Sequence, residues 1–152
     1  GAKTRVPVSV WAEVAAVVSD KTGYVPVLIG ESGATSAGDR WPASVPAVDL
    51  RGKLSLGATA RMLASAKLCL SRDSGPAHVA AAMGCPTACV FLENTPAMGP
   101  VRWTPLGRAV RTVVPAVTPR WYERWCFGAY RKRAVGAILA ADILAAAESL
   151  LG

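Results

Sequence analysis

Histidine is nearly absent from this chain of 152 residues, which contains His78 alone. The four cysteines form no C-x-x-C pair, so neither residue type supplies the spacing of a zinc site, and we expect no metal. Three of the cysteines stand in apolar runs, where a reduced thiol behaves as a small hydrophobic side chain. This pattern indicates a reducing compartment. No signal peptide opens the sequence, so we expect a cytoplasmic protein.

Acidic residues are scarce between 102 and 133, where Glu123 alone opposes eight arginine and lysine side chains. This segment therefore carries the whole net charge of +7, because the nine basic and nine acidic residues elsewhere cancel. In the stretch RWYERWCFGAYRKR (120–133) the arginines interleave with aromatic residues. The pattern favours a phosphate-rich partner or an anionic membrane surface, and the alternative is a solvated basic linker.

The sequence also lacks an apolar run long enough for a convincing membrane span. Its most apolar stretch, 134–151, is short and contains Asp142 and Glu148. We therefore expect a C-terminal helix that is buried or crosses between domains.

Short apolar runs alternate with helical patterns along the rest of the chain. Strands are expected at 24–30, 47–50, 67–71, 87–91 and 109–115. Helices are expected at 9–20, which Ser9 would cap and Gly23 would end, at 56–66 after Ser55, and at 77–83, with a long loop over 93–107. Continuous apolar strands are typical of a parallel sheet with helices on both faces. The expected fold class is therefore α/β and Rossmann-like.

The stretch SRDSGPAHVAAAMGCPTACVF (71–91) combines polar chemistry with a predicted strand–turn–helix corner. A helix start offers free N–H groups and a positive dipole, which suit phosphate, and Gly75 would let a ligand approach the backbone. Pro76 fits the first helical turn, and Ser74 and His78 would project toward the same ligand. Asp73 repels phosphate and more plausibly accepts hydrogen bonds from hydroxyl groups. A sugar joined to a diphosphate would satisfy both halves of the corner.

A structural explanation of the same residues is open. Asp73 and Ser74 could form an ordinary helix cap, and His78 could be a half-buried residue with satisfied nitrogens. Gly30 and Glu31, which follow the strand expected at 24–30, could form a simple βα turn.

The run DSGPAHVAAAMGCPTACVF resembles the signature of the bacterial heptosyltransferases of lipopolysaccharide synthesis, glycosyltransferase family nine. Its pattern is D-[ST]-G-x-x-H followed by an Ala-rich helix and a buried strand. The segments LRGKLSLGATARMLASAKLCLSRDSG (50–75), TPAMGPVRWTPLG (95–107) and TRVPVSVWAEVAAVV near the start also resemble the family. The resemblance covers roughly residues 3–115.

The resemblance implies the C-terminal half of a GT-B fold, which holds the nucleotide-sugar donor, and an inverting transfer without metal or cofactor. Asp73 would hold sugar hydroxyls, and Ser74, Gly75, Pro76 and the following amides would hold the diphosphate, with His78 beside it. The remaining donor-binding positions implied are Lys3, Thr4, Gly30 and Glu31. The family's lysine falls on Thr4, with Lys3 one position off. Glu93 replaces the glycine usual after the strand at 87–91.

The N-terminal half of such an enzyme, with its acceptor site and catalytic base, has no counterpart here, so no catalytic residue is assigned. We expect a nucleotide-sugar-binding domain over 1–133, apparently without its first strand, and a C-terminal helix over 134–152. The complete protein is expected to be a glycosyltransferase using an ADP-heptose-like donor and a lipid-linked or lipopolysaccharide acceptor, cytoplasmic or peripheral at the inner membrane. The chain alone is expected to be inactive.

Two other functions fit parts of the sequence. One is a non-catalytic module that binds anions or nucleic acid through 120–133, although no recognisable nucleic-acid-binding fold surrounds that stretch and we expect no nucleic acid. The other is one half of a nucleotide-sugar epimerase.

Overall fold

The computed structural model describes residues 5–31, 40–94, 99–118, 120–124 and 127–152. Parallel strands alternate with helices along the chain. The strands are β1 (Val27–Leu28), β2 (Val48–Asp49), β3 (Cys69–Arg72), β4 (Thr87–Val90) and β5 (Val110–Val113). The helices are α1 (Val8–Thr22), α2 (Leu56–Ser65), α3 (Gly75–Ala82), α4 (Pro100–Trp103), the 3-10 turn η3 (Trp121–Arg124), α5 (Phe127–Ala137) and α6 (Ala140–Leu151).

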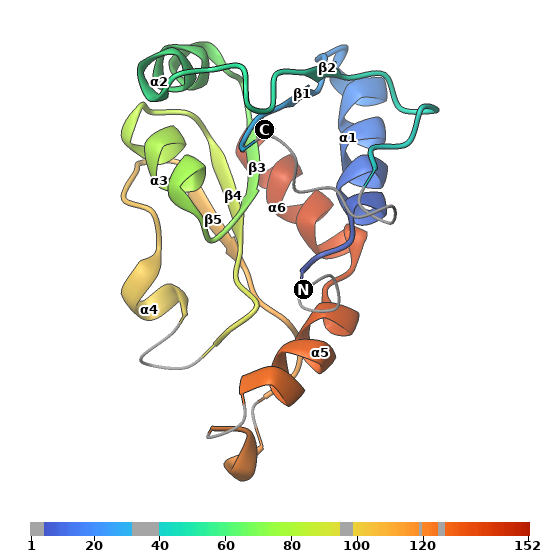
Figure 1. Ribbon diagram of the computed structural model, residues 1–152, viewed down its shortest axis with the longest axis vertical. Coiled ribbons are helices and arrows are strands. Elements are labelled where there is room, and N and C mark those ends of the chain that lie inside the picture. The colour runs from blue at the N-terminus through green and yellow to red at the C-terminus, as the bar shows by residue number, and fades with distance from the viewer. Residues whose placement is uncertain (1–4, 32–39, 95–98, 119, 125–126) are drawn as a thin grey trace.

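The strands form two parallel sheets, one of β1–β2 and one of β3–β4–β5. Helices α2 and α3 lie on one side of the larger sheet, and α1 and α6 lie on the other (Figure 1). This arrangement confirms the α/β class with helices on both faces. Within the described residues, β1 and β3 do not pair, so each is an edge strand.

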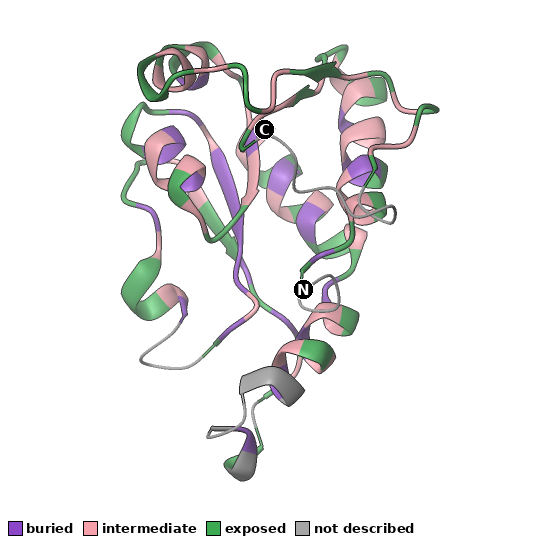
Figure 2. Cartoon of the chain, viewed as in Figure 1, coloured by how far each residue is buried: buried purple, intermediate pink, exposed green. Residues whose placement is uncertain are grey.

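The core follows from the apolar runs. All four residues of β4 are buried, as expected for the middle strand of a covered sheet (Figure 2). On one face, Val14 and Val18 of α1 pack with Ile143 and Ala147 of α6. On the other face, Leu63 of α2 packs with Cys69, Ala80 and Cys85. Burial raises the pKa of the Cys69 thiol to about 12 and that of Cys85 to about 11, so both act as hydrophobic groups.

The helix boundaries confirm part of the sequence analysis. The Ser55 hydroxyl accepts a hydrogen bond from the Ala58 amide at 3.2 Å, as predicted for the cap of α2. Gly23 ends α1 in the left-handed conformation, with φ of 73°. Ser9 is not a cap: α1 begins one residue earlier, at Val8, after Pro7, whose fixed φ of −58° leads the chain into the helix.

Two expectations about strands and loops were wrong. The strand expected at 24–30 shrinks to two residues, and Val27 is 41% exposed rather than buried, because β1 pairs on one edge only. The region 93–107 is not all loop, since it contains the short helix α4.

The predicted C-terminal helix is two helices. α5 begins at Phe127, inside the basic segment, and the chain bends by 62° before α6. The Leu139 amide donates to the Asp142 carboxylate at 3.0 Å, which stabilises a new helix start at this point. Among the described residues no single helix has the length and apolar character of a membrane span. The bent pair does so by length and composition alone.

Candidate functional site

The predicted corner lies between β3 and α3. β3 ends at Arg72, Ser74 takes an extended conformation, and α3 begins at Gly75 with Pro76 in its first turn. The Ser74 side chain makes no hydrogen bond to the helix. Its hydroxyl donates instead to the Arg72 carbonyl at 3.1 Å. The ordinary cap that Ser74 could have formed is therefore not made, and no serine oxygen blocks the start of α3.

Asp73 and His78 face each other at this corner. The His78 Nε2 lies 3.7 Å from the Asp73 Oδ1, which is too long for a hydrogen bond, and each side chain is 43% exposed. The Asp73 amide donates to the Val90 carbonyl at 2.9 Å, which fixes its backbone at the end of the sheet. Both polar groups are thus held at the carboxyl edge of the strands and are accessible to a ligand.

A cleft of ≈ 720 Å³ opens beside the start of α3. It brings together four of the predicted positions, two after β1 and two at α3. Its lining comprises Gly30, Glu31, Leu50, Gly52, Leu54, Leu56, Thr59, Gly75, Pro76 and Val79. Asp73 and Ser74 belong to the adjoining turn and His78 to α3, and none of the three lines the cleft. Lys3 and Thr4 lie outside the described residues.

Two glycine turns form one wall of the cleft. Gly30 and Gly52 both have positive φ, at 129° and 69°, and the Gly52 amide donates to the Gly30 carbonyl at 2.8 Å. A side chain at either position would be strained, so the backbone lies open to the cleft there. The leucines and Thr59 of the cleft lining were not predicted as site residues. The only sequence signal for them was the segment 50–75, which we used for the family resemblance alone.

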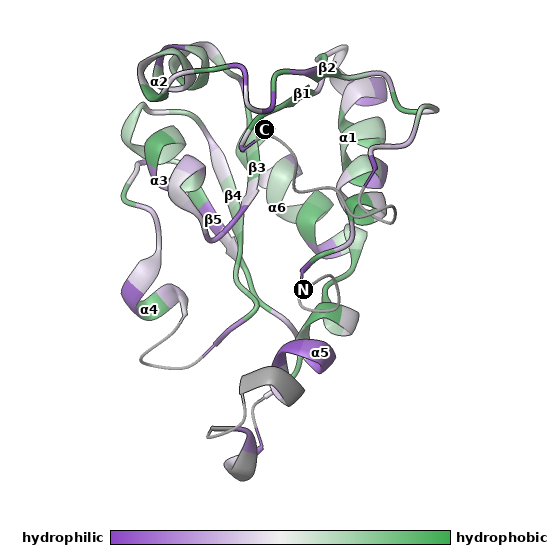
Figure 3. Cartoon of the chain, viewed as in Figure 1, coloured by the Kyte–Doolittle hydropathy of each residue, from purple (hydrophilic) through white to green (hydrophobic). Residues whose placement is uncertain are grey.

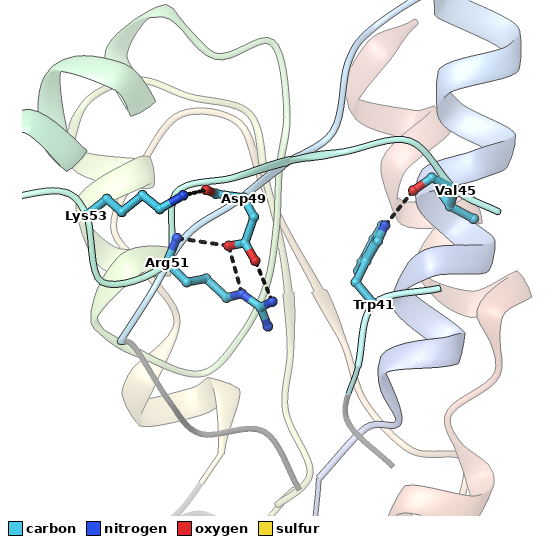
Figure 4. A network of polar contacts seen from close by, with 5 residues as sticks. All are labelled: Trp41, Val45, Asp49, Arg51 and Lys53. Carbon is cyan, nitrogen blue, oxygen red and sulfur yellow. Dashed lines mark hydrogen bonds and ion pairs between the residues drawn. The ribbon is translucent and has the colours of Figure 1, made fainter. Parts of the chain in front are cut away.

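An ion pair stiffens the turn that follows β2 (Figure 4). The Arg51 guanidinium donates twice to the Asp49 carboxylate, at 2.9 and 2.7 Å, and Lys53 donates to the Asp49 carbonyl at 2.7 Å. The Arg51 hydrogen bonds lower the pKa of Asp49 to about 2, so this carboxylate stays ionised. Asp49 and Arg51 also border a second cavity of ≈ 430 Å³. Trp41, which lines the same cavity, donates to the Val45 carbonyl at 2.7 Å.

Two further ion pairs anchor the basic segment. Glu93, which follows β4, is 8% exposed, and one of its oxygens accepts two bonds from Arg131 of α5, both at 2.6 Å. Its other oxygen is buried and has no hydrogen-bond partner among the described residues. Glu123 is 3% exposed and accepts from Arg133 at 2.5 Å. Within the described residues no cluster of three or more histidine, cysteine, aspartate or glutamate side chains could hold a metal ion.

Parallel strands with helices on both faces define an α/β domain of the Rossmann-like class, and comparison with known proteins identifies its family. The profile of glycosyltransferase family 9 (heptosyltransferase) matches residues 2–119. The chain therefore belongs to glycosyltransferase family 9. No curated protein matches it.

Solved structures give the fold and the coverage. A family 9 glycosyl transferase from Veillonella parvula is 21% identical, with a TM-score of 0.74 over 98% of this chain. The E. coli ADP-heptose lps heptosyltransferase II is 22% identical, with a TM-score of 0.70 over 99% of this chain. The chain matches part of these GT-B structures, spanning 42% and 43% of their lengths.

Proposed function

We propose that this chain is the donor-binding part of a family 9 glycosyltransferase and holds a nucleotide-diphosphate sugar of the ADP-heptose type. The observation that carries the proposal is the cleft, which joins Gly30 and Glu31 after β1 to Gly75 and Pro76 at the start of α3. The E. coli enzyme that shares the fold is named for ADP-heptose and lipopolysaccharide, which supports this donor class.

Different residues are assigned to different parts of the donor. The Gly75 amide at the start of α3 binds the diphosphate, where the helix dipole favours negative charge. Pro76 has no N–H, and the Ala77 amide donates to the Ser74 carbonyl at 3.0 Å, so Gly75 is the backbone donor assigned to the phosphates. Asp73 accepts hydrogen bonds from sugar hydroxyls, and His78 lies beside them. Gly30 and Glu31 contact the nucleoside. Lys3 and Thr4 are assigned to the phosphates from the family resemblance alone.

The complete protein transfers the sugar with inversion to a lipid-linked or lipopolysaccharide acceptor, in the cytoplasm or at the inner face of the inner membrane of a bacterium. Its acceptor site and catalytic base belong to the part of the family structures that this chain does not match. Within the described residues β1 and β3 do not pair, and in the doubly wound order another strand lies between these two positions.

Calorimetry with ADP-heptose, free heptose and a short oligonucleotide, at low and high salt, tests the proposal. We expect ADP-heptose to bind more tightly than the free sugar, because its diphosphate makes charge-assisted hydrogen bonds of ~1.5–3 kcal/mol each. Oligonucleotide binding that is stronger and strongly salt-dependent would favour the nucleic-acid alternative instead. Reversible interconversion of the sugar's epimers would favour an epimerase.

A further inference from the structure

Three large apolar side chains stand out from α4 and the loop after it. Val101 is 85% exposed, Leu106 is 88% exposed and Trp103 is 44% exposed. Figure 2 shows α4 as a largely exposed element at the side of the molecule. Single exposed apolar residues are common on protein surfaces, but three within six residues form a patch that needs an explanation.

Basic residues lie near these side chains in the sequence, and acidic residues do not. Arg102 lies over the Trp103 ring, 5.5 Å from its centroid, and Arg108 and Arg111 are exposed on the same stretch. Within the described chain, none of these three arginines takes part in an ion pair. The sequence contains no aspartate or glutamate between Glu93 and Glu123. Figure 3 shows hydrophilic and hydrophobic residues side by side on α4.

The backbone holds this surface in place. Gly107 packs against Ala81 of α3, since a Cβ added at Gly107 would lie 2.8 Å from the Ala81 carbonyl oxygen. Pro105 is buried, and the Thr104 hydroxyl donates to the Pro100 carbonyl at 2.5 Å. Leu106 is therefore presented outward between two anchored neighbours.

The basic segment 120–133 is less suited to an external anion than its composition predicted. Arg131 and Arg133 are already paired with Glu93 and Glu123, and Tyr130 is 2% exposed. The Tyr130 ring packs inward, so it offers no surface to an external partner. Uncompensated charge and exposed apolar area occur together at α4 instead.

We propose that the α4 surface, defined as Val101, Arg102, Trp103, Leu106 and Arg108, docks onto an anionic lipid membrane. Arginines bind lipid phosphates, the tryptophan suits the interface, and the valine and leucine enter the boundary of the hydrocarbon. Val101 and Leu106 cannot stack on nucleobases, so their exposure favours lipid over nucleic acid. The proposal is independent of donor binding, because no residue of this surface lines the cleft.

Co-sedimentation of the full chain with phosphatidylcholine vesicles, with and without phosphatidylglycerol, tests the α4 surface. We expect binding to the anionic vesicles only, and a loss of about tenfold in partitioning for Leu106→Glu. Val25→Glu is the matched control, since Val25 is 65% exposed outside the α4 surface and should bind as wild type does. Thermal melting confirms that both variants fold, and donor calorimetry should be unchanged in both.

Three outcomes would overturn the proposal. One is no binding to anionic vesicles. Another is binding that persists in Leu106→Glu but is lost at high salt, because such binding would depend on electrostatic attraction alone. The third is a loss with Trp121→Glu but not with Leu106→Glu, which would place the contact in the segment 120–133.

Discussion

A side chain at Gly75 would clash with a bound ligand but not with the protein itself. A Cβ built there meets nothing within 4 Å, and its φ is not in the left-handed region. We predict that Gly75→Val abolishes binding of ADP-heptose, because the side chain would block approach to the Gly75 amide at the start of α3, while the melting temperature stays near that of wild type. Gly136→Val is the control, since Gly136 of α5 is equally open and lies outside the cleft. Calorimetry on the folded variants decides, and unchanged affinity in Gly75→Val would refute the phosphate-binding role.

Gly107 is constrained in the opposite way. A Cβ at this position would lie 2.8 Å from the carbonyl oxygen of Ala81 and 3.0 Å from its Cβ, so backbone would have to move. We predict that Gly107→Ala lowers the free energy of unfolding by ~1–3 kcal/mol, as measured by urea denaturation. In Gly57→Ala the new Cβ would meet only the end of the Arg61 side chain, at 3.8 Å, so this change in α2 should instead raise the free energy of unfolding by ~0.5–1 kcal/mol. Equal effects in the two variants would show that the contact with Ala81 is not tight.

Residue chemistry that acts locally could be predicted from the sequence. The Ser55 cap, the Gly23 helix end and the hydrophobic role of Cys69 depend on neighbours within a few residues or on an apolar run. The partners of Glu93 and Glu123 could not be predicted. Arg131 lies 38 residues from Glu93, and only the packing of α5 beside the end of β4 brings them together.

At the scale of elements, η3 and α5 are tied together by one buried carboxylate. Two hydrogen bonds hold the pKa of Glu123 below its ordinary value of 4.5. The larger effect comes from the Arg133 guanidinium, and the smaller from the Arg120 backbone N–H, which donates at 2.8 Å. The folded state therefore favours the ionised carboxylate. Its contribution to stability is complete above about pH 4.5 and is lost as the pH falls through the lowered folded pKa.

We predict that Glu123→Gln is less stable than wild type at neutral pH and that this difference shrinks as the pH is lowered below 4.5. Urea titrations across this range measure it. Glu148→Gln is the control, because Glu148 pairs with Lys21 on the surface, where ion pairs contribute little. A Glu123→Gln difference that is constant with pH would contradict the ionic role.

Element identity was predictable where an apolar run or a turn signal decided it. β3, β4, β5 and the start of α3 follow from such signals, as does the parallel arrangement. The break at Ile138–Leu139 could not be predicted, since its apolar residues continue the helical pattern and Asp142 acts as a cap only once the chain has bent. The cleft was predictable at its glycine and proline turns. Its leucine side depends on how α2 packs beside the turn after β2.

On the scale of the whole molecule, α1 and α6 share one hydrophobic core, while the strands are divided between two sheets. α6 contributes Ile143 and Ala147 to the same core as α1, so the C-terminal helix supports the sheet directly. The division into 1–133 and 134–152 stays a prediction. β1, by contrast, has β2 as its one sheet neighbour in the described part of the chain, and its Val27 is exposed.

The chain should bind its donor without consuming it. Transfer requires an acceptor oxygen and a base opposite the sugar, and these are expected in the greater part of the family structures that this chain does not match. We predict calorimetric binding of ADP-heptose together with no ADP release when a lipopolysaccharide precursor is added. A family 9 enzyme of full length, assayed in parallel, shows that the donor and acceptor are competent. ADP release that rises with the concentration of this chain and disappears in Gly75→Val would show that these 152 residues already contain the catalytic group.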